Sequence, residues 1–455
     1  MNATGNGTAR TEATVPMFDE ERSLPAPGAT GGDLTPERLA ALHQDVVAAA
    51  WREDLTVLRD GRPVLYPMLP SLRTLTTGFE RHLARSMPHI TSAWRKVITG
   101  YRENPELKEF LAVPDALRPW VEASPATDHR VDFCRFDMVG GSIGTARIVE
   151  FNANCPGGAL FTSAFRRLWA EHGAVKELFD RWGVARDALH EGEWFARLLF
   201  SSTGATSGDT VALFHQPGGN TLEIGKMRAI LEQEDCQVVV THPAAGDWRR
   251  HDVRAGYLKY GVQAVLADAA GWRAFLQRVS SGALPLVNPL PGRWIGDNKL
   301  CLAVLSDPRF HHLFNAAETE AIGRLIPFSR KAGDGVDHGE LLRDRGAWVI
   351  KGPYDTQGRS VHVGAQTDRD RWARIATRAV REGWLVQEAV DPSRITWHGR
   401  RAYQDLSVVW LRGRPSGYMS RISENFKVNV AQGGGRQMVF GNEAVSWADD
   451  TAPHA

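Results

Sequence analysis

The sequence carries almost no net charge, because its 54 basic residues are matched by 53 acidic ones. A chain without an excess of one sign is not typical of proteins that attract nucleic acid or an anionic membrane surface by general electrostatics. We therefore expect a small-molecule substrate, with no nucleic-acid partner and no membrane partner.

Cysteine is scarce, and the four cysteines are scattered along the chain. Their spacing is not that of a zinc site, and their density is far below that of a disulfide scaffold. No segment is apolar over the roughly eighteen residues of a membrane helix, and the first residues do not resemble an export signal. These absences favour reduced thiols and a cytoplasmic location.

The GxGxxG fingerprint of dinucleotide-binding proteins is also missing. This disfavours a nicotinamide dehydrogenase, although Gly218 and Gly219 lie between an apolar strand and a helix whose N-terminus could hold an anion. The glycines fit an ordinary turn equally well.

The 455 residues suffice for two or three domains of an α/β and α+β protein. Thr35 and Pro36 begin a helix, and a mostly helical region is expected to continue to about Trp120. The segment 261–268 is expected to form a strand, and Arg369–Glu382 a helix. The predicted divisions are a disordered tail, a helical region with a hairpin, an α/β layer and an α+β region: 1–33, 34–200, 201–306 and 307–455.

The predicted hairpin carries the strongest chemical signal. Strand alternation places Glu150 and Asn152 on one face, and a turn near Ile143-Gly144 would place Asp137 opposite Glu150. Two carboxylates and an amide oxygen form a hard-oxygen site that suits Mg²⁺. An ordinary polar strand face gives the same pattern.

Two lysines lie where phosphate would be a suitable partner. Lys299 begins a helix, and Lys351 lies on a strand between apolar residues and a glycine-containing loop. A lysine in apolar surroundings needs an anionic partner, and phosphate is one that lysine binds well. A surface lysine whose stem covers apolar neighbours remains an alternative for each.

Two further segments have weaker signals. Gln387 and Glu388 close an apolar strand, and could form a hinge that hydrogen-bonds an adenine edge. Arg421 lies on a later strand. The planar guanidinium group of an arginine matches the geometry of a carboxylate or of a phosphoryl group during its transfer. Without its neighbours, the hinge is only the end of a strand.

In their order along the chain, these segments resemble the ATP-grasp superfamily, in particular its circularly permuted branch that includes glutathionylspermidine synthetases. The resemblance covers about Val131 to Phe440 and rests on several short motifs. The matching positions are Arg135, Asp137, Glu150, Asn152, Asn288-Pro289, Asn298-Lys299, Lys351 to Gly358, Gln387-Glu388 and Arg421. The sequence differs from that branch in lacking an amidase domain, and its Asp137–Glu150 spacing is one residue longer than expected.

The resemblance implies a circularly permuted ATP-grasp fold, with a pre-ATP-grasp-like α/β layer and a lid. It implies ATP on Lys299, Lys351, Gly358, Gln387 and Glu388, and Mg²⁺ on Asp137, Glu150 and Asn152. Arg135 and Arg421 would stabilise developing charge.

The expected activity is ATP-dependent ligation of a carboxylate to an amine, with release of ADP and phosphate. By analogy the substrates would be amino acids, joined as a dipeptide or γ-glutamyl amide in specialised metabolism. The alternatives are a kinase-like phosphorylating enzyme on the same scaffold and a nucleotide-binding protein without turnover. A homodimer is compatible with the sequence, which does not set the oligomeric state.

Overall fold

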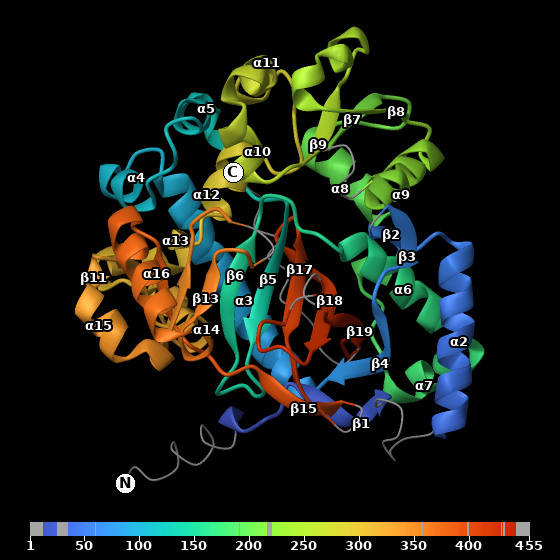
Figure 1. The fold of residues 1–455 in the computed structure, drawn as a ribbon. Helices are drawn as coiled ribbons and strands as arrows, with labels where there is room; N and C mark the ends of the chain where they lie inside the picture. Colours follow the sequence, from blue (N-terminus) through green and yellow to red (C-terminus); the bar gives the residue numbers. More distant parts are fainter. Residues whose placement is uncertain are drawn as a thin grey trace.

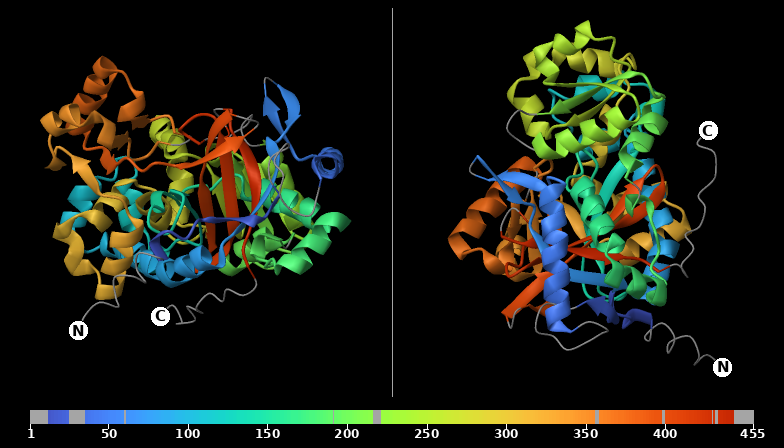
Figure 2. Two further views of the ribbon diagram at one scale, coloured as in Figure 1. Left: turned by 90° about the horizontal axis from the view of Figure 1, so that it is seen from below. Right: turned by 90° about the vertical axis from the view of Figure 1, so that its right-hand side faces the viewer.

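The computed structural model describes residues 12–24, 35–59, 61–190, 192–215, 221–355, 358–397, 400–428, 430 and 433–442. Gly218 and Gly219, with their predicted anion site, lie outside these residues. The described strands form four sheets, of nine, five, three and two strands. Figures 1 and 2 show the largest sheet at the centre, with the other parts around it.

The central sheet combines strands from both ends of the chain. Its main path is β1 (Phe18–Leu24), β4 (Met68–Leu75), β19 (Gly435–Phe440), β18 (Arg414–Ser423), β17 (Leu406–Leu411), β5 (Phe133–Val139) and β6 (Arg147–Asn152). The strands β15 (Ser393–Trp397) and β16 (Arg400–Gln404) extend it beside β18. Neighbouring strands are antiparallel except β4 and β19, which are parallel.

The hairpin β5–β6 forms because its residues alternate in polarity. Phe136 and Met138 are buried in the core beneath helix α3 (Thr77–Gly100). Arg135 and Asp137 lie on the opposite face, as a two-residue period requires. Asp137 pairs directly with Glu150, so the predicted register is confirmed.

The α/β layer contains β7 (Thr210–His215), β8 (Gln237–Thr241) and β9 (Ala255–Lys259). These strands are parallel, in the order β8-β7-β9, so the predicted α/β layer is present. Strand β9 was not predicted from the sequence. In the right-hand view of Figure 2 this sheet and its helices lie above the central sheet. The helices are α8 (Trp194–Thr203), α9 (Thr221–Gln233), α10 (Val262–Ala267) and α11 (Ala269–Ser280).

A five-stranded sheet forms the part opposite α2 and α6 in Figure 1. Its strands, in sheet order, are β11 (Gly335–Val336), β10 (Ser329–Ala332), β14 (Leu385–Glu388), β12 (Trp348–Lys351) and β13 (Val361–Val363). Helices α15 (His338–Arg343) and α16 (Arg369–Glu382) belong to the same part, and α16 has the predicted bounds.

The described residues also form further α-helices and a two-stranded sheet. They are α2 (Pro36–Arg52), β2 (Thr56–Arg59), β3 (Arg62–Leu65), α4 (Pro105–Leu111), α5 (Arg118–Ala123), α6 (Ala159–Glu171), α7 (Gly173–Trp182), α12 (Leu290–Gly296), α13 (Leu300–Ser306) and α14 (Ala316–Leu325). Thr35 caps α2 as predicted, accepting a hydrogen bond from the backbone N–H of Arg38. Among the described residues, none of the helices combines the length and apolar character of a membrane span.

Three sequence predictions need correction. Residues 18–24, predicted within a disordered tail, form β1 because Met17 and Phe18 find a buried position beside β4. The region before Trp120 is not mostly helical throughout, since β2, β3 and β4 interrupt it. The segment 261–268 forms helix α10, because β9 just before it already supplies the third parallel strand.

The central sheet also crosses the predicted domain boundaries. Strands β5 and β6 come from residues 34–200, whereas β17, β18 and β19 come from residues 307–455. One face of this sheet packs on α3, and the other packs partly on α8. The uncovered part of that second face carries the polar residues of the hairpin.

Candidate active site

A cavity of about 840 Å³ lies where the central sheet, the five-stranded sheet and the carboxyl edge of the parallel sheet meet. Every residue proposed as a site residue from the sequence lines it. They are Arg135, Asp137, Glu150, Asn152, Lys299, Lys351, Gly358, Gln387, Glu388 and Arg421. The fold therefore brings these distant segments to one place, while their individual roles stay predictions.

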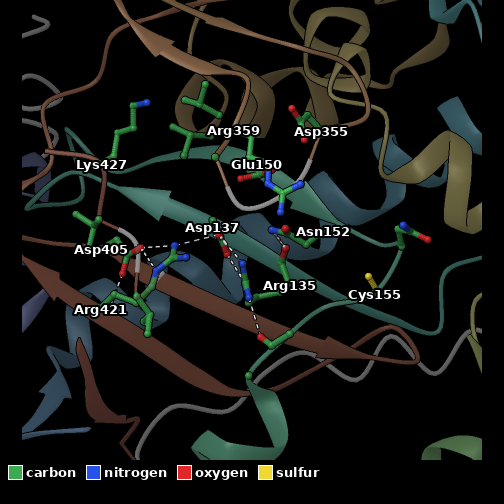
Figure 3. A pocket seen from close by; sticks show the side chains of 18 of the residues that line it. Arg135, Asp137, Glu150, Asn152, Cys155, Asp355, Arg359, Asp405, Arg421 and Lys427 are labelled. Carbon is green, nitrogen blue, oxygen red and sulfur yellow. Dashed lines mark hydrogen bonds and ion pairs between the residues drawn. The ribbon is translucent and has the colours of Figure 1, made fainter. Parts of the chain in front are cut away.

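The floor of the cavity is a chain of alternating charges on the central sheet. Arg135 donates two hydrogen bonds to Asp137, from Nε at 2.6 Å and from Nη2 at 2.8 Å. Arg421 donates from Nη2 to the same carboxylate at 3.0 Å and from Nε to Asp405 at 2.7 Å. Figure 3 shows Arg421 between the two carboxylates.

The two carboxylates of this chain differ in acidity. Burial acts to raise the pKa of Asp137, but Arg135 and Arg421 outweigh it and hold that pKa well below its ordinary range. Burial raises the pKa of Asp405, and its arginine partner Arg421 offsets this only in part. Asp137 is therefore the stronger acid of the two, and it lies between the two guanidinium groups.

The predicted Mg²⁺ site depends on which oxygen atoms of Asp137, Glu150 and Asn152 are free to bind a cation. A carboxylate has about four acceptor positions, and those of Asp137 take two bonds from Arg135, one from Arg421 and one from Ser407 Oγ at 2.9 Å. Glu150 and Asn152 are half-buried and line the cavity with hard oxygen atoms. The residues fit Mg²⁺ through Glu150 and Asn152, and Asp137 joins them only if a guanidinium group moves.

Lys299 lies at the end of α13 that faces the cavity, and it is almost fully buried. Its Nζ is 3.1 Å from Glu150 Oε1 and donates to the carbonyl of Asp355 at 2.7 Å. Burial acts to lower the pKa of Lys299, but Glu150 and Asp297 outweigh it and raise that pKa. Lys299 is therefore a fixed positive charge beside the predicted metal ligand.

Lys351 has no carboxylate partner among the described residues. Its Nζ donates to the Val149 carbonyl at 2.7 Å and to Gln387 Oε1 at 2.6 Å. Burial lowers the pKa of Lys351 to about 8, with nearby Lys299 adding to the effect and Glu150 opposing it. A buried ammonium group in this state favours an incoming anion.

The predicted hinge has less freedom to bind adenine than the sequence suggested. The Gln387 side chain, besides accepting from Lys351, donates to Ser329 Oγ at 3.1 Å. The N–H groups of Glu388 and Ala389 donate, each at 2.8 Å, to the carbonyls of Phe328, just before β10, and Ala347, just before β12. The Glu388 carboxylate and Gly358, with a φ of +68°, still line the cavity.

Sequence reasoning missed several charged residues of the wall. They are Glu223, Lys259, Asp297, Asp355, Arg359, Asp405, Lys427 and Arg436. Asp405 interrupts an apolar strand and Arg436 follows a triple glycine, and these signals could have drawn attention to both. Lys259 and Glu223 form a buried ion pair of 2.8 Å, which no local pattern reveals because the two residues come from β9 and α9.

Comparison with known proteins supports the architecture. No protein-family model matches the chain, and no curated protein matches its sequence. A glutathione synthetase-like effector of Globodera pallida, solved in its apo form, superposes with a TM-score of 0.57 over 90% of this chain and 98% of that one, at 14% identity. The chain has a glutathione synthetase-like fold.

A second structure, a putative γ-glutamylcysteine synthetase of Methylobacillus flagellatus, reaches a TM-score of 0.35 at 12% identity over 75% of this chain and 84% of that one. That similarity is too low to carry an argument. The fold from the first comparison is compatible with the predicted ATP-grasp fold, and its circular permutation stays a prediction.

Proposed function

We propose that this protein is an ATP-dependent carboxylate–amine ligase that forms an amide through an acyl phosphate and releases ADP and phosphate. The observation that carries the proposal is the meeting of all the proposed site residues in one cavity. The glutathione synthetase-like fold supports it, since proteins of that description are named for ligation.

The nucleotide would place its phosphates beside Lys351 and Lys299. Lys351 is a buried cation without a carboxylate partner among the described residues, and a phosphate would supply the missing negative charge. The adenine would lie toward Glu388 and the end of β14. Mg²⁺, held by Glu150 and Asn152, would neutralise phosphate charge and favour departure of ADP.

The reacting carboxylate would lie over the arginine pair on the central sheet. Its oxygen attacks the γ-phosphorus, the bond to the ADP oxygen breaks, and an acyl phosphate forms. An amine then attacks the acyl carbon and displaces phosphate, and the departing phosphate takes the proton that the amine loses. Arg135 and Arg421 are already fixed by Asp137 and Asp405, so they can stabilise the developing charge without reorganising.

The decisive test follows the oxygen of the carboxylate. With an ¹⁸O-labelled carboxylate substrate, one labelled oxygen should appear in the released phosphate, and the nucleotide product should be ADP. A matrix of amino acids and amines, screened for ADP release and analysed by mass spectrometry, identifies the substrates for this measurement.

The other outcomes separate the alternatives. AMP that carries the label would indicate adenylation, and unlabelled phosphate during amide formation would exclude an acyl phosphate. A phosphorylated product formed without any amine would favour the kinase-like alternative. Nucleotide binding without ADP release under the whole matrix would favour a non-catalytic protein.

A further inference from the structure

The buried cations of the cavity divide into two groups by their partners. Lys259 pairs with Glu223, and Lys299 pairs with Glu150. Lys351 lacks a carboxylate among the described residues, and the proposed function assigns it a phosphate. Arg436 lines the same cavity and is 4% exposed. It also has no carboxylate partner among the described residues.

Arg436 is held in place without being neutralised. It lies on β19 directly opposite Arg421 on β18, and its backbone N–H donates to Pro67. Its Nε donates to the Tyr66 hydroxyl at 2.6 Å, and its guanidinium carbon lies 5.4 Å from the centre of the Tyr66 ring. A phenol fixes the orientation of the fork but supplies no negative charge, so Arg436 has no anionic partner among the described residues.

The surroundings of Arg436 are apolar on one side. Tyr66 stacks on Phe161 with ring centres 4.8 Å apart and an interplanar angle of 12°. Val57 and Leu58, from the β2–β3 hairpin, line the cavity as well, and Leu58 is 48% exposed. An anion bound by Arg436 would therefore lie beside a surface that suits an aliphatic or aromatic group.

On its other side Arg436 adjoins the reaction site. It packs so closely against Gly158 that a Cβ there would overlap its Nη2 atom. The carbonyl of the preceding residue, Gly157, accepts a hydrogen bond from Arg135 at 2.8 Å. Neighbouring Cα atoms are only about 3.8 Å apart, so a group held by Arg436 lies close to the carboxylate proposed to react at Arg135.

We propose that Arg436 binds the α-carboxylate of the amine substrate, and that this substrate is an α-amino acid with an apolar side chain. The side chain packs against Val57, Leu58 and Tyr66, and the α-amine points toward the acyl phosphate. This inference rests on the proposed function and names the class of its amine substrate.

The test compares free amino acids with their amides, which keep the amine and side chain but lack the carboxylate. L-Leucine and L-phenylalanine are titrated against leucinamide and phenylalaninamide by calorimetry, with Mg²⁺ and a non-hydrolysable ATP analogue present. We expect the wild-type protein to prefer the free acids by about ten- to a hundredfold, the range for a charged, two-pronged hydrogen-bonded contact. Arg436→Met should abolish this preference, whereas the exposed Arg414→Met should retain it.

Arg436→Lys is a second variant that distinguishes loss of the carboxylate contact from a folding defect. It keeps the positive charge and the long stem but loses the two-pronged guanidinium group. It should bind the free acids with intermediate affinity. Equal binding of acids and amides by the wild-type protein, failure of the free acids to bind, or a preference that survives in Arg436→Met would overturn the inference.

ADP release with the same compounds separates this inference from the proposed function. If the wild-type protein binds the free acids through Arg436 but releases no ADP with any carboxylate partner, the ligase proposal fails and the carboxylate site stands. If ADP and amide form with amines that lack a carboxylate, and Arg436→Met has no effect on them, the ligase proposal stands and the inference fails.

Discussion

A lysine buried beside another lysine must find a negative charge or lose its proton. Lys351 is 5% exposed, and among the described residues its Nζ donates hydrogen bonds only to neutral oxygen atoms. Burial is the chief cause that lowers its pKa to about 8. Lys259 and Lys299 each have a carboxylate partner, so among these three buried lysines Lys351 is the one available to an incoming phosphate. The unpaired charge thus gives nucleotide binding a specific dependence on pH.

Lys351→Met should weaken ATP binding by about ten- to a hundredfold at neutral pH, because a charged hydrogen bond to phosphate is lost. In the wild-type protein, phosphate should raise the pKa of Lys351 above 8. Affinity should then be constant below pH 8 and fall as the pH rises above it, by up to about tenfold per unit. Calorimetric titration of a non-hydrolysable ATP analogue from pH 7 to 9.5 measures both effects.

The exposed Lys176 on α7 provides the control for this measurement, since Lys176→Met removes the same charge far from the cavity. That variant should retain both the affinity and its pH dependence. An unchanged nucleotide affinity in Lys351→Met would leave Lys351 as a structural lysine only.

Glu150 belongs to the cavity and not to the core, so its removal should affect activity more than folding. Glu150→Ala should abolish ligation because it deletes the proposed Mg²⁺ ligand and leaves Lys299 without its carboxylate. Glu150→Gln, which retains the size of the side chain, should also be inactive. ADP release across a Mg²⁺ series measures the loss, and thermal melting checks the fold.

The exposed Glu171→Gln on α6 is the matched control and should keep full activity. Turnover by Glu150→Ala at saturating Mg²⁺ would remove Glu150 from the metal site.

At the scale of single elements, the periodicity of the sequence predicted the structure correctly where the interacting residues are close along the chain. The β5–β6 register follows from alternation and one turn, so Asp137 and Glu150 could be placed opposite each other before the structure was known. Helix α16 and the parallel strands β7 and β8 carry equally local signals. Composition failed for β1, because two buried apolar residues are enough to anchor a strand in an otherwise polar segment.

Long-range pairing explains the residues that local patterns missed. Asp405 becomes important only because β17 lies beside β5, which brings Arg421 between two carboxylates. Arg436 becomes a site residue only because β19 pairs with β18. The hinge shows the reverse case. Gln387 lines the cavity, but its side chain hydrogen-bonds Lys351 and Ser329, so an adenine would have to use other groups.

At the scale of the whole molecule, the cavity joins parts that also share a hydrophobic core. One continuous cluster of buried residues includes Phe136 of the central sheet, Phe214 of the parallel sheet and Leu385 of the five-stranded sheet. Because this core extends through all three sheets, we expect them to unfold together. A ligand in the cavity contacts the same three sheets, so its binding energy should stabilise the whole unit.

Thermal melting with a non-hydrolysable ATP analogue measures this stabilisation. At a concentration about a hundred times Kd, the nucleotide should add about 2.7 kcal/mol to the free energy of unfolding. For 455 residues this corresponds to a rise in Tm of about 3 °C in a single transition. Lys351→Met should show a smaller rise at the same concentration. Two transitions, of which the nucleotide moves only one, would mean that the sheets unfold independently and that the nucleotide binds within one of them.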